Sequence, residues 1–169
     1  MTVYHEGRFR RVEGEESLSG LGGKPWYIEA DTLWIPTEKG LFRYVEGRVQ
    51  PFLPDEINTP VQSIVRDTEG RLWVGTRQDG IYRIEAGGTL RQFTLEDGLP
   101  SLTTQSLLPD REGGVWALMR NDALRAKYVV RIAGDRVEML HYSNRFAPSE
   151  FRYVDAEGGI WFSARTEGW

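Results

Sequence analysis

The chain has 169 residues, with 21 basic and 25 acidic side chains and a formal net charge of −4. The two signs are interleaved along the sequence, which argues against a nucleic-acid partner and against direct membrane contact in this segment. No cysteine is present, so disulfides and thiolate chemistry are excluded. The apolar runs are short and predict neither a membrane span nor a signal peptide.

The N-terminal segment, residues 2–13, begins with TVYHEGRFRRV. It has the pattern of LFRYVEGRVQPF from Leu41, in which two short runs flank a Glu-Gly turn. We therefore expect the third and fourth strands of a four-stranded unit here. The SLSGLGG stretch that follows, residues 17–23, predicts a long loop.

Three complete four-stranded antiparallel units are predicted next, at residues 25–53, 61–95 and 103–142. The second is the clearest, because VQSIV, RLWVGT, IYRIE and TLRQFTL are short apolar or alternating runs bounded by Gly or Asp turns. Nineteen glycines and 12% aromatic residues fit the same all-β interpretation. The predicted strands are 25–29, 32–36, 41–45, 48–53, 61–65, 71–76, 81–85, 89–95, 103–108, 114–119, 124–132 and 136–142.

The C-terminal segment, residues 151–169, contains FRYVDAEGGIWFSA, which matches the first two strands of a unit. Residues 2–13 would complete it, and the fold class is then a β-propeller of four-stranded antiparallel blades over residues 1–169. Two arrangements remain open. The chain either closes as a four-bladed ring, with both termini in one sheet, or forms part of a larger propeller.

A tryptophan recurs in the second strand of every unit, with spacings of 39, 43 and 45 residues. We expect each ring to fill the space between neighbouring blades. Three of the four belong to an Asp-x-x-Gly-x-x-Trp motif, whose Asp can accept hydrogen bonds from turn N–H groups. A calcium site is not expected, because the Asp residues lie on separate blades. The tryptophans are Trp34, Trp73, Trp116 and Trp161.

The WVGT sequence at residues 73–76, with an upstream Asp-x-x-Gly, a downstream GIYR and the later EDGLPS, resembles the two-component regulator propeller repeat. The likeness covers essentially the whole chain and is strongest from Val61 to Trp116. It implies a sensor piece from the periplasmic region of a bacterial hybrid histidine kinase or related regulator, with the signalling domain elsewhere on the intact protein. WIPT and WALM depart from WVGT, and Ala123 replaces the glycine found at Gly80.

Candidate ligand-binding residues lie in loops that a propeller gathers on one face. The predicted inner turns at residues 37–39, 77–79, 120–122 and 164–167 mix cations and carboxylates. Guanidinium groups in such turns suit a carboxylated or sulfated ligand, and the alternative is a solvated turn. The candidates are Arg77, Asp79, Arg120, Asn121 and Arg165 in these turns and Asn144, Arg145 and Phe146 in a connection between blades.

These features favour a non-enzymatic sensory module that binds an oligosaccharide or another polar ligand, or dimerises, through its loop face. One alternative is a propeller-type polysaccharide lyase or hydrolase, and the other is a purely structural interaction repeat. No catalytic residue, metal site or cofactor is predicted, and His5 and His141 are interpreted as ordinary strand residues beside aromatics.

Overall fold

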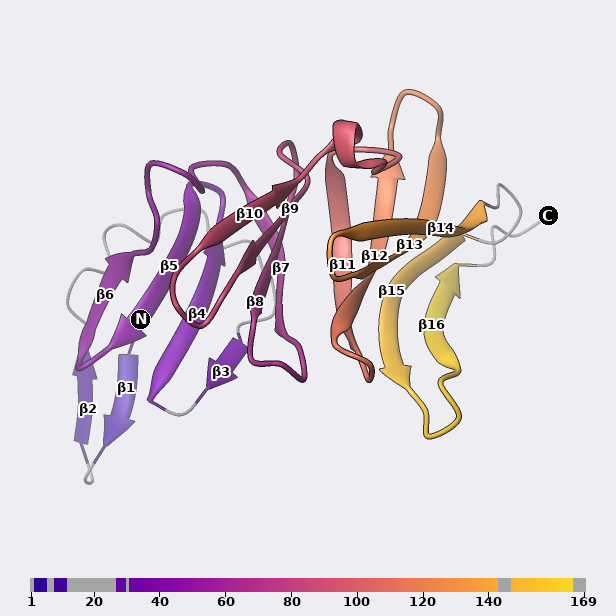
Figure 1. The fold of residues 1–169 in the computed structure, drawn as a ribbon. Coiled ribbons are helices and arrows are strands. Elements are labelled where there is room, and N and C mark those ends of the chain that lie inside the picture. The colour runs from indigo at the N-terminus through magenta and orange to yellow at the C-terminus, as the bar shows by residue number, and fades with distance from the viewer. Residues whose placement is uncertain (1, 6–7, 12–26, 30, 143–146, 166–169) are drawn as a thin grey trace. The chain divides into compact units, whose positions relative to one another are not determined.

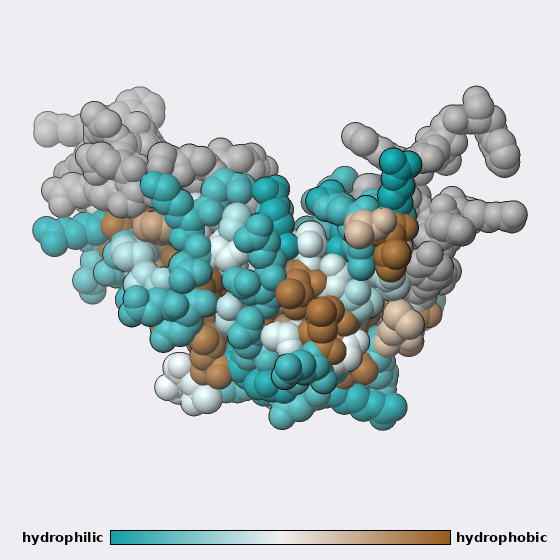
Figure 2. Space-filling view, turned by 90° about the horizontal axis from the view of Figure 1, so that it is seen from above, coloured by the Kyte–Doolittle hydropathy of each residue, from teal (hydrophilic) through white to brown (hydrophobic). Residues whose placement is uncertain are grey.

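A computed structural model describes residues 2–5, 8–11, 27–29, 31–142 and 147–165. The chain divides into two compact units, residues 1–61 and residues 62–169, each with sheets of its own. In the described ranges, no helix has the length and apolar character that crossing a lipid bilayer requires. Hydrophilic residues cover most of the described surface seen in Figure 2, with smaller hydrophobic areas between them.

The first unit contains an antiparallel hairpin and a four-stranded antiparallel sheet. The hairpin consists of β1 (Thr2–His5) and β2 (Arg8–Arg11). The sheet has the order β3-β4-β5-β6, and its strands are β3 (Tyr27–Glu29), β4 (Thr32–Thr37), β5 (Gly40–Val45) and β6 (Arg48–Pro51). Chain order equals spatial order, as predicted for a meander.

The second unit contains two four-stranded antiparallel sheets and a further two-stranded sheet (Figure 1). The predicted all-β architecture of four-stranded blades is therefore confirmed. Completion of the last pair by residues 2–13 stays a prediction. The strands are β7 (Val61–Arg66), β8 (Leu72–Thr76), β9 (Ile81–Ile84) and β10 (Leu90–Phe93); β11 (Thr103–Asp110), β12 (Gly114–Asn121), β13 (Ala126–Ala133) and β14 (Arg136–Tyr142); and β15 (Ala147–Val154) and β16 (Ile160–Arg165).

Several predicted strands were too long by one to three residues, and for two of them the local reason is clear. The strand predicted at residues 89–95 ends at Phe93, because Thr94 caps a 3₁₀ helix, η2 (Leu95–Asp97), that begins the connection to β11. The Thr94 side chain accepts a hydrogen bond from the Glu96 N–H, as part of a capping box. The strand predicted at 124–132 begins at Ala126, because Arg125 has a positive φ of 50°.

The core of the second unit lies between successive sheets, and a tryptophan fills it, as predicted. The Trp73 side chain is 0% exposed and stacks on Phe93, with ring centroids 5.6 Å apart. Val115 and Ile132 of the next sheet belong to the same buried cluster. Trp116 packs against the cluster that β12 shares with β15 and β16.

The Asp-x-x-Gly-x-x-Trp motif holds this core tryptophan in place. Asp67 Oδ1 accepts hydrogen bonds from the backbone N–H groups of Glu69 and Arg71, both at 2.9 Å. Asp67 Oδ2 accepts from Trp73 Nε1 at 2.6 Å and from Arg71 Nε at 2.7 Å. One carboxylate thus closes the turn, as predicted, and also fixes the indole, a role the sequence analysis missed.

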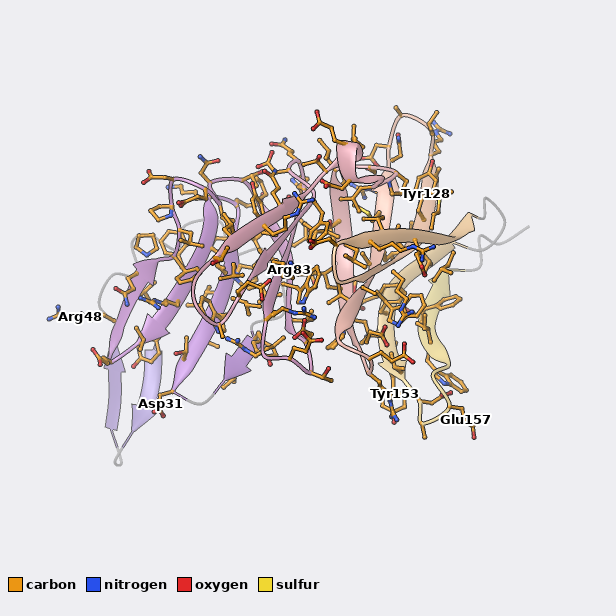
Figure 3. The ribbon with its side chains drawn as sticks, viewed as in Figure 1. Asp31, Arg48, Arg83, Tyr128, Tyr153 and Glu157 are labelled. Atoms are coloured by element: carbon orange, nitrogen blue, oxygen red, sulfur yellow. The ribbon has the colours of Figure 1, made fainter. Side chains whose placement is uncertain are left out.

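The later repeats use the same aspartate position in two ways. In the β15–β16 hairpin, whose tip carries Glu157 (Figure 3), Asp155 accepts from Trp161 Nε1 at 2.8 Å. In the preceding repeat, Asp110 Oδ2 accepts from Arg131 Nε at 2.7 Å. The motif is therefore structural in each described repeat that contains it.

The environment of Asp67 makes the stability of the second unit dependent on pH. Burial alone would raise the pKa of this carboxyl, but the hydrogen bonds from Trp73 and Arg71 outweigh burial and hold the pKa below its ordinary value. A carboxyl with a lowered folded-state pKa stabilises the fold fully above its unfolded pKa of about 4. That contribution is lost as the pH falls through the folded-state pKa.

We expect Asp67→Asn to lower the free energy of unfolding at pH 7 by about 1–3 kcal/mol, because charge-assisted hydrogen bonds are lost. The difference from the unmodified chain should shrink as the pH falls below about 4. Urea unfolding at pH 7 and at pH 3 measures both effects. Asp155→Asn is the matched control and should cost less at pH 7, because its partner Trp161 is 62% exposed. Equal losses for the two variants at pH 7 would contradict this account.

Gly75 allows β8 and β11 to approach closely. A Cβ at this position would lie 2.5 Å from Thr104 Cγ2. The Thr104 side chain cannot simply turn away, because it is buried and its hydroxyl donates to the Gly80 carbonyl oxygen at 3.2 Å. This glycine of the WVGT sequence is therefore required by packing between sheets.

Gly75→Ala should lower the stability of the second unit by about 1–3 kcal/mol, the usual cost of overpacking. The urea midpoint measures the loss. Gly87→Ala is the control, because a Cβ at Gly87 meets no atom within 4 Å. If both variants unfold at the same midpoint, close approach at Gly75 does not limit stability.

Candidate functional site

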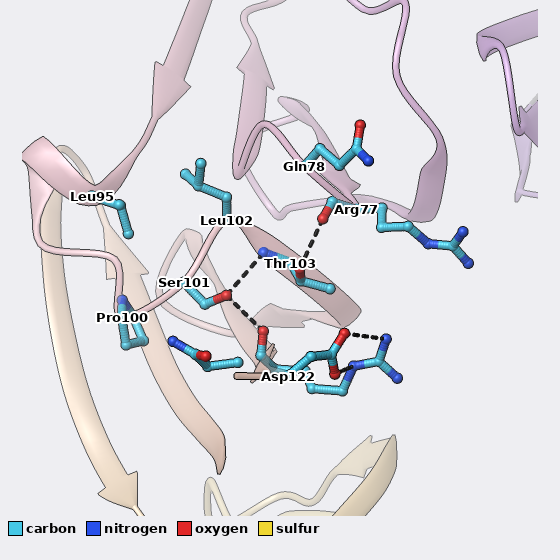
Figure 4. A pocket seen from close by; sticks show the side chains of 10 residues that line it. Arg77, Gln78, Leu95, Pro100, Ser101, Leu102, Thr103 and Asp122 are labelled. Atoms are coloured by element: carbon cyan, nitrogen blue, oxygen red, sulfur yellow. Dashed lines mark hydrogen bonds and ion pairs between the residues drawn. The ribbon is translucent and has the colours of Figure 1, made fainter. Parts of the chain in front are cut away.

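A pocket of about 430 Å³ opens on the second unit where three segments meet. These segments are the β8–β9 turn, the connection from β10 to β11 and the end of β12 (Figure 4). They belong to two neighbouring sheets of one unit. The lining residues are Arg77, Gln78, Leu95, Pro100, Ser101, Leu102, Thr103, Arg120, Asn121 and Asp122.

Gly80 joins the β8–β9 turn to the connection that enters β11. Its N–H donates to the Leu102 carbonyl oxygen at 2.9 Å, and its carbonyl oxygen accepts from the hydroxyls of Thr76 and Thr104. The φ of Gly80 is +77°, and a Cβ there would clash with the Phe93 carbonyl oxygen. Only glycine meets both requirements. Gly80 therefore fixes the β8–β9 turn beside the connection that enters β11.

Two hydroxyl groups fix the floor of the pocket. The Ser101 hydroxyl donates to the Arg120 carbonyl oxygen at 2.6 Å and accepts from the Thr103 N–H at 3.1 Å. The Thr103 hydroxyl donates to the Arg77 carbonyl oxygen at 2.8 Å. The connection is thus hydrogen-bonded to the β8–β9 turn and to the end of β12 (Figure 4).

The charged groups of the pocket partly neutralise one another. Arg120 Nη2 donates to Asp122 Oδ2 at 3.1 Å, and Arg120 Nε lies 2.7 Å from Asp122 Oδ1 without hydrogen-bond alignment. Arg77 lines the pocket from the facing turn. Asn121 accepts from the Leu124 N–H through its side-chain oxygen. The lining therefore offers amides and charged groups beside the apolar side chains of Leu95, Pro100 and Leu102.

Asp79 lies in the same turn as Arg77, and two hydrogen bonds hold its backbone. Its carbonyl oxygen accepts from Gln92 Nε2 at 2.9 Å, and its N–H donates to the Thr76 hydroxyl. Burial raises the pKa of Tyr82, and the negative charge of Asp79 adds to this effect. Asp79 is not among the lining residues.

The structure brings three of the predicted ligand-binding residues together, namely Arg77, Arg120 and Asn121. Two predicted turns were misplaced, because β12 continues through Asn121 and β16 continues through Arg165. Arg165 is paired with Ala147 in a strand rather than placed in a turn. Asn144, Arg145 and Phe146 lie outside the described residues.

The sequence analysis missed the part of the site that the long connection supplies. Leu95, Pro100, Ser101 and Thr103 come from this connection. Two signals were available: the Thr-x-x-Asp capping pattern at residues 94–97, which ends β10, and the turn residues of EDGLPS. In the described residues, no group of three His, Cys, Asp or Glu side chains is placed to hold a metal ion.

Ser101→Ala should loosen the connection with a global loss of about 1 kcal/mol, the net value of a typical hydrogen bond. We expect faster amide hydrogen exchange at Thr103, whose N–H loses its acceptor, and at Gly80, which bonds the neighbouring carbonyl. Exchange at Thr76 should not change, because its N–H donates to Gly80 within the turn. Unchanged exchange at Thr103 would show that the hydroxyl does not order the connection.

Part of the chain matches a known family. Residues 55–78 match the family model described as two component regulator propeller. This match contains the Asp67–Trp73 motif and the following WVGT sequence. No relative was found among curated protein sequences.

Solved structures of similar fold include two extracellular domains from B. thetaiotaomicron. One is assigned to the hybrid two component system BT3049, with a TM-score of 0.69 and 20% identity over 96% of this chain and 23% of that chain. The other is assigned to the one component system BT4673, with a TM-score of 0.65 and 22% identity over 82% of this chain and 21% of that chain.

A third solved structure is PorZ, a surface component of the type-IX secretion system of Porphyromonas gingivalis. Its TM-score is 0.61, with 16% identity over 89% of this chain and 25% of that chain. The chain thus spans about a quarter of the length of these three structures. At such identities, the likeness shows the fold.

The predicted resemblance is therefore confirmed by a match that includes the first two strands of the clearest repeat, and the all-β fold of the described chain agrees with it. Residues 55–78, which include the first two strands of the second repeat, are thus similar to the two component regulator propeller family.

Proposed function

We propose that this chain is a non-enzymatic recognition module of a bacterial signal-transduction protein and that it binds a polar ligand in the pocket of its second unit. The observation that carries the proposal is the convergence of loops from two neighbouring sheets on one pocket. Loops held by a rigid β scaffold are common sites of recognition. The family match supports a place in signalling, with the signalling domain elsewhere on the intact protein.

The location proposed for the module is the periplasm. Two similar solved structures are extracellular domains of bacterial regulatory systems. A sensor on the outer side of the inner membrane can meet nutrients that have not entered the cell. Dimerisation through the loop face is a second proposed role. The solution mass of the intact protein tests it.

An oligosaccharide suits the composition of the pocket. Apolar surface from Leu95, Pro100 and Leu102 can cover the less polar face of a sugar ring, while Gln78 and Asn121 offer amide groups for hydroxyls. Arg77 and Arg120 can add hydrogen bonds to hydroxyl or acidic groups. The ion pair between Arg120 and Asp122 reduces the net positive charge of the pocket. The test therefore includes neutral sugars as well as acidic ones.

The test is a thermal-shift screen of the full chain against neutral and acidic oligosaccharides. A ligand present at about 100 times its Kd should stabilise the binding state by about 2.7 kcal/mol. Arg77→Ala and Arg120→Ala should reduce the upshift for the same ligand. Arg136→Ala is the matched control, because Arg136 is 80% exposed and is not among the lining residues.

Two results would contradict the proposal. One is an upshift that both pocket variants retain in full, which would place the ligand elsewhere. The other is release of shortened sugars from a polysaccharide, which would identify an enzyme rather than a recognition module.

A further inference from the structure

The pocket of the second unit carries an excess of positive charge at its lining. Among the described residues that line it, Arg77 and Arg120 are cations and Asp122 is an anion. The side-chain oxygen of Asn121 already accepts a backbone N–H, so its NH₂ group is the part that remains for a ligand. A guanidinium group donates hydrogen bonds and accepts none. The polar lining therefore favours a ligand that brings acceptors and negative charge.

Arg120 also has a second cation beside it. In the β12–β13 pair, Arg120 lies directly opposite Lys127. Residues paired in this way lie on the same face of a sheet, and like charges in such a pair repel each other. Lys127 does not line the pocket, but its ammonium charge adds to that of Arg120. An anion bound at Arg120 would offset this repulsion.

In the structure, Asp122 is the anion that neutralises Arg120, and the contact between them is exposed. Arg120 Nη2 donates to Asp122 Oδ2 at 3.1 Å (Figure 4). The Arg120 side chain is 43% exposed and the Asp122 side chain is 69% exposed. Ion pairs as exposed as this one contribute little to stability. A ligand carboxylate that accepts two aligned hydrogen bonds from the guanidinium can therefore compete with Asp122.

The cation of this pair is anchored, whereas the anion lies on a turn. Arg120 is part of β12, where it is paired with Thr103 of β11, and its carbonyl oxygen accepts from the Ser101 hydroxyl at 2.6 Å. Asp122 follows the end of β12, and its carbonyl oxygen accepts from the Arg125 N–H at 3.3 Å. The Asp122 side chain can thus rotate away from Arg120 without breaking a hydrogen bond of the sheet.

We propose that Asp122 occupies the place of a ligand carboxylate and that the ligand of this pocket is a sugar acid, such as a uronic acid. The carboxylate of the sugar binds the Arg120 guanidinium and displaces the Asp122 side chain towards solvent. Arg77 and the amide of Asn121 bind further oxygens of the sugar. This inference rests on the proposed function, because it names the class of ligand and the competing residue for the same pocket.

The side-chain Nε–H of Arg120 is the reporter of occupancy. The full chain is labelled with ¹⁵N in its arginine side chains and titrated with sodium trigalacturonate, while sodium chloride is withdrawn to hold the ionic strength constant. The Arg120 resonance is assigned by its loss in Arg120→Lys. Fully methyl-esterified trigalacturonate is the matched probe, with the same rings and no charge. We expect a saturable shift of the Arg120 resonance with the acid, and affinity about tenfold or more above that of the ester.

A pair of variants tests the competition. Asp122→Asn removes the competing carboxylate and should tighten binding of the acid by about two- to fivefold, the range that corresponds to an exposed ion pair. Binding of the ester should not change. Glu96→Gln is the matched control, because it removes one negative charge from an exposed residue of the connection that does not line the pocket. We expect this variant to bind both probes as the unmodified chain does.

The outcomes separate this inference from the proposed function. Equal affinity for the acid and the ester overturns the inference and leaves a pocket for polar ligands in place. If Asp122→Asn binds the acid no more tightly than Glu96→Gln does, Asp122 is not a competitor and the inference is also overturned. If neither probe moves the Arg120 resonance, the inference fails, and the proposed function fails with it only if the thermal-shift screen finds no upshift.

Discussion

The architecture of the second unit depends on the packing of one large indole between neighbouring sheets. Trp73 is fully buried, and the next sheet covers it with Val115 and Ile132. Burial of an aromatic side chain of this size contributes about 3 kcal/mol or more. The sheets can meet around the indole only because Gly75 leaves room for the fully buried Thr104. A large residue and a missing side chain, two positions apart on β8, are therefore parts of one packing arrangement.

The same packing determines what happens at the two ends of the sheets. At one end, the Asp67 carboxylate closes the turn before β8 and holds the Trp73 indole, so the turn and the core are stabilised together. At the other end, Gly80 forms hydrogen bonds with Leu102 in the connection and with Thr104 in β11 of the neighbouring sheet. That contact places the connection beside the β8–β9 turn and creates the pocket. The candidate site is thus a consequence of the distance between sheets.

The tryptophan is kept in every repeat, but the hydrogen bonds around it differ. The tryptophan recurs in all four repeats, but its indole binds an aspartate in the second and fourth. In the third, Asp110 receives Arg131. In the first, neither Trp34 Nε1 nor Arg43 Nε has an acceptor among the described residues.

The sequence by itself determined the strands, their order and the core position of Trp73, because these follow from short-range patterns: apolar alternation, Gly and Asp turns, and a recurring Trp. The same expectation was wrong for Trp161, which is 62% exposed. The sequence also indicated the turn that carries Arg77, and it singled out Arg120, which the structure places in β12. It did not locate Ser101, Leu95 or the Arg120–Asp122 pairing in the pocket, and it assigned Arg165 to a turn although β16 includes it. Only the tertiary structure decided these points, because which side chains share a pocket depends on how closely two sheets pack and how a capped connection crosses between them. That separation is set by Trp73, Gly75 and Thr104 acting together, and no local pattern encodes it.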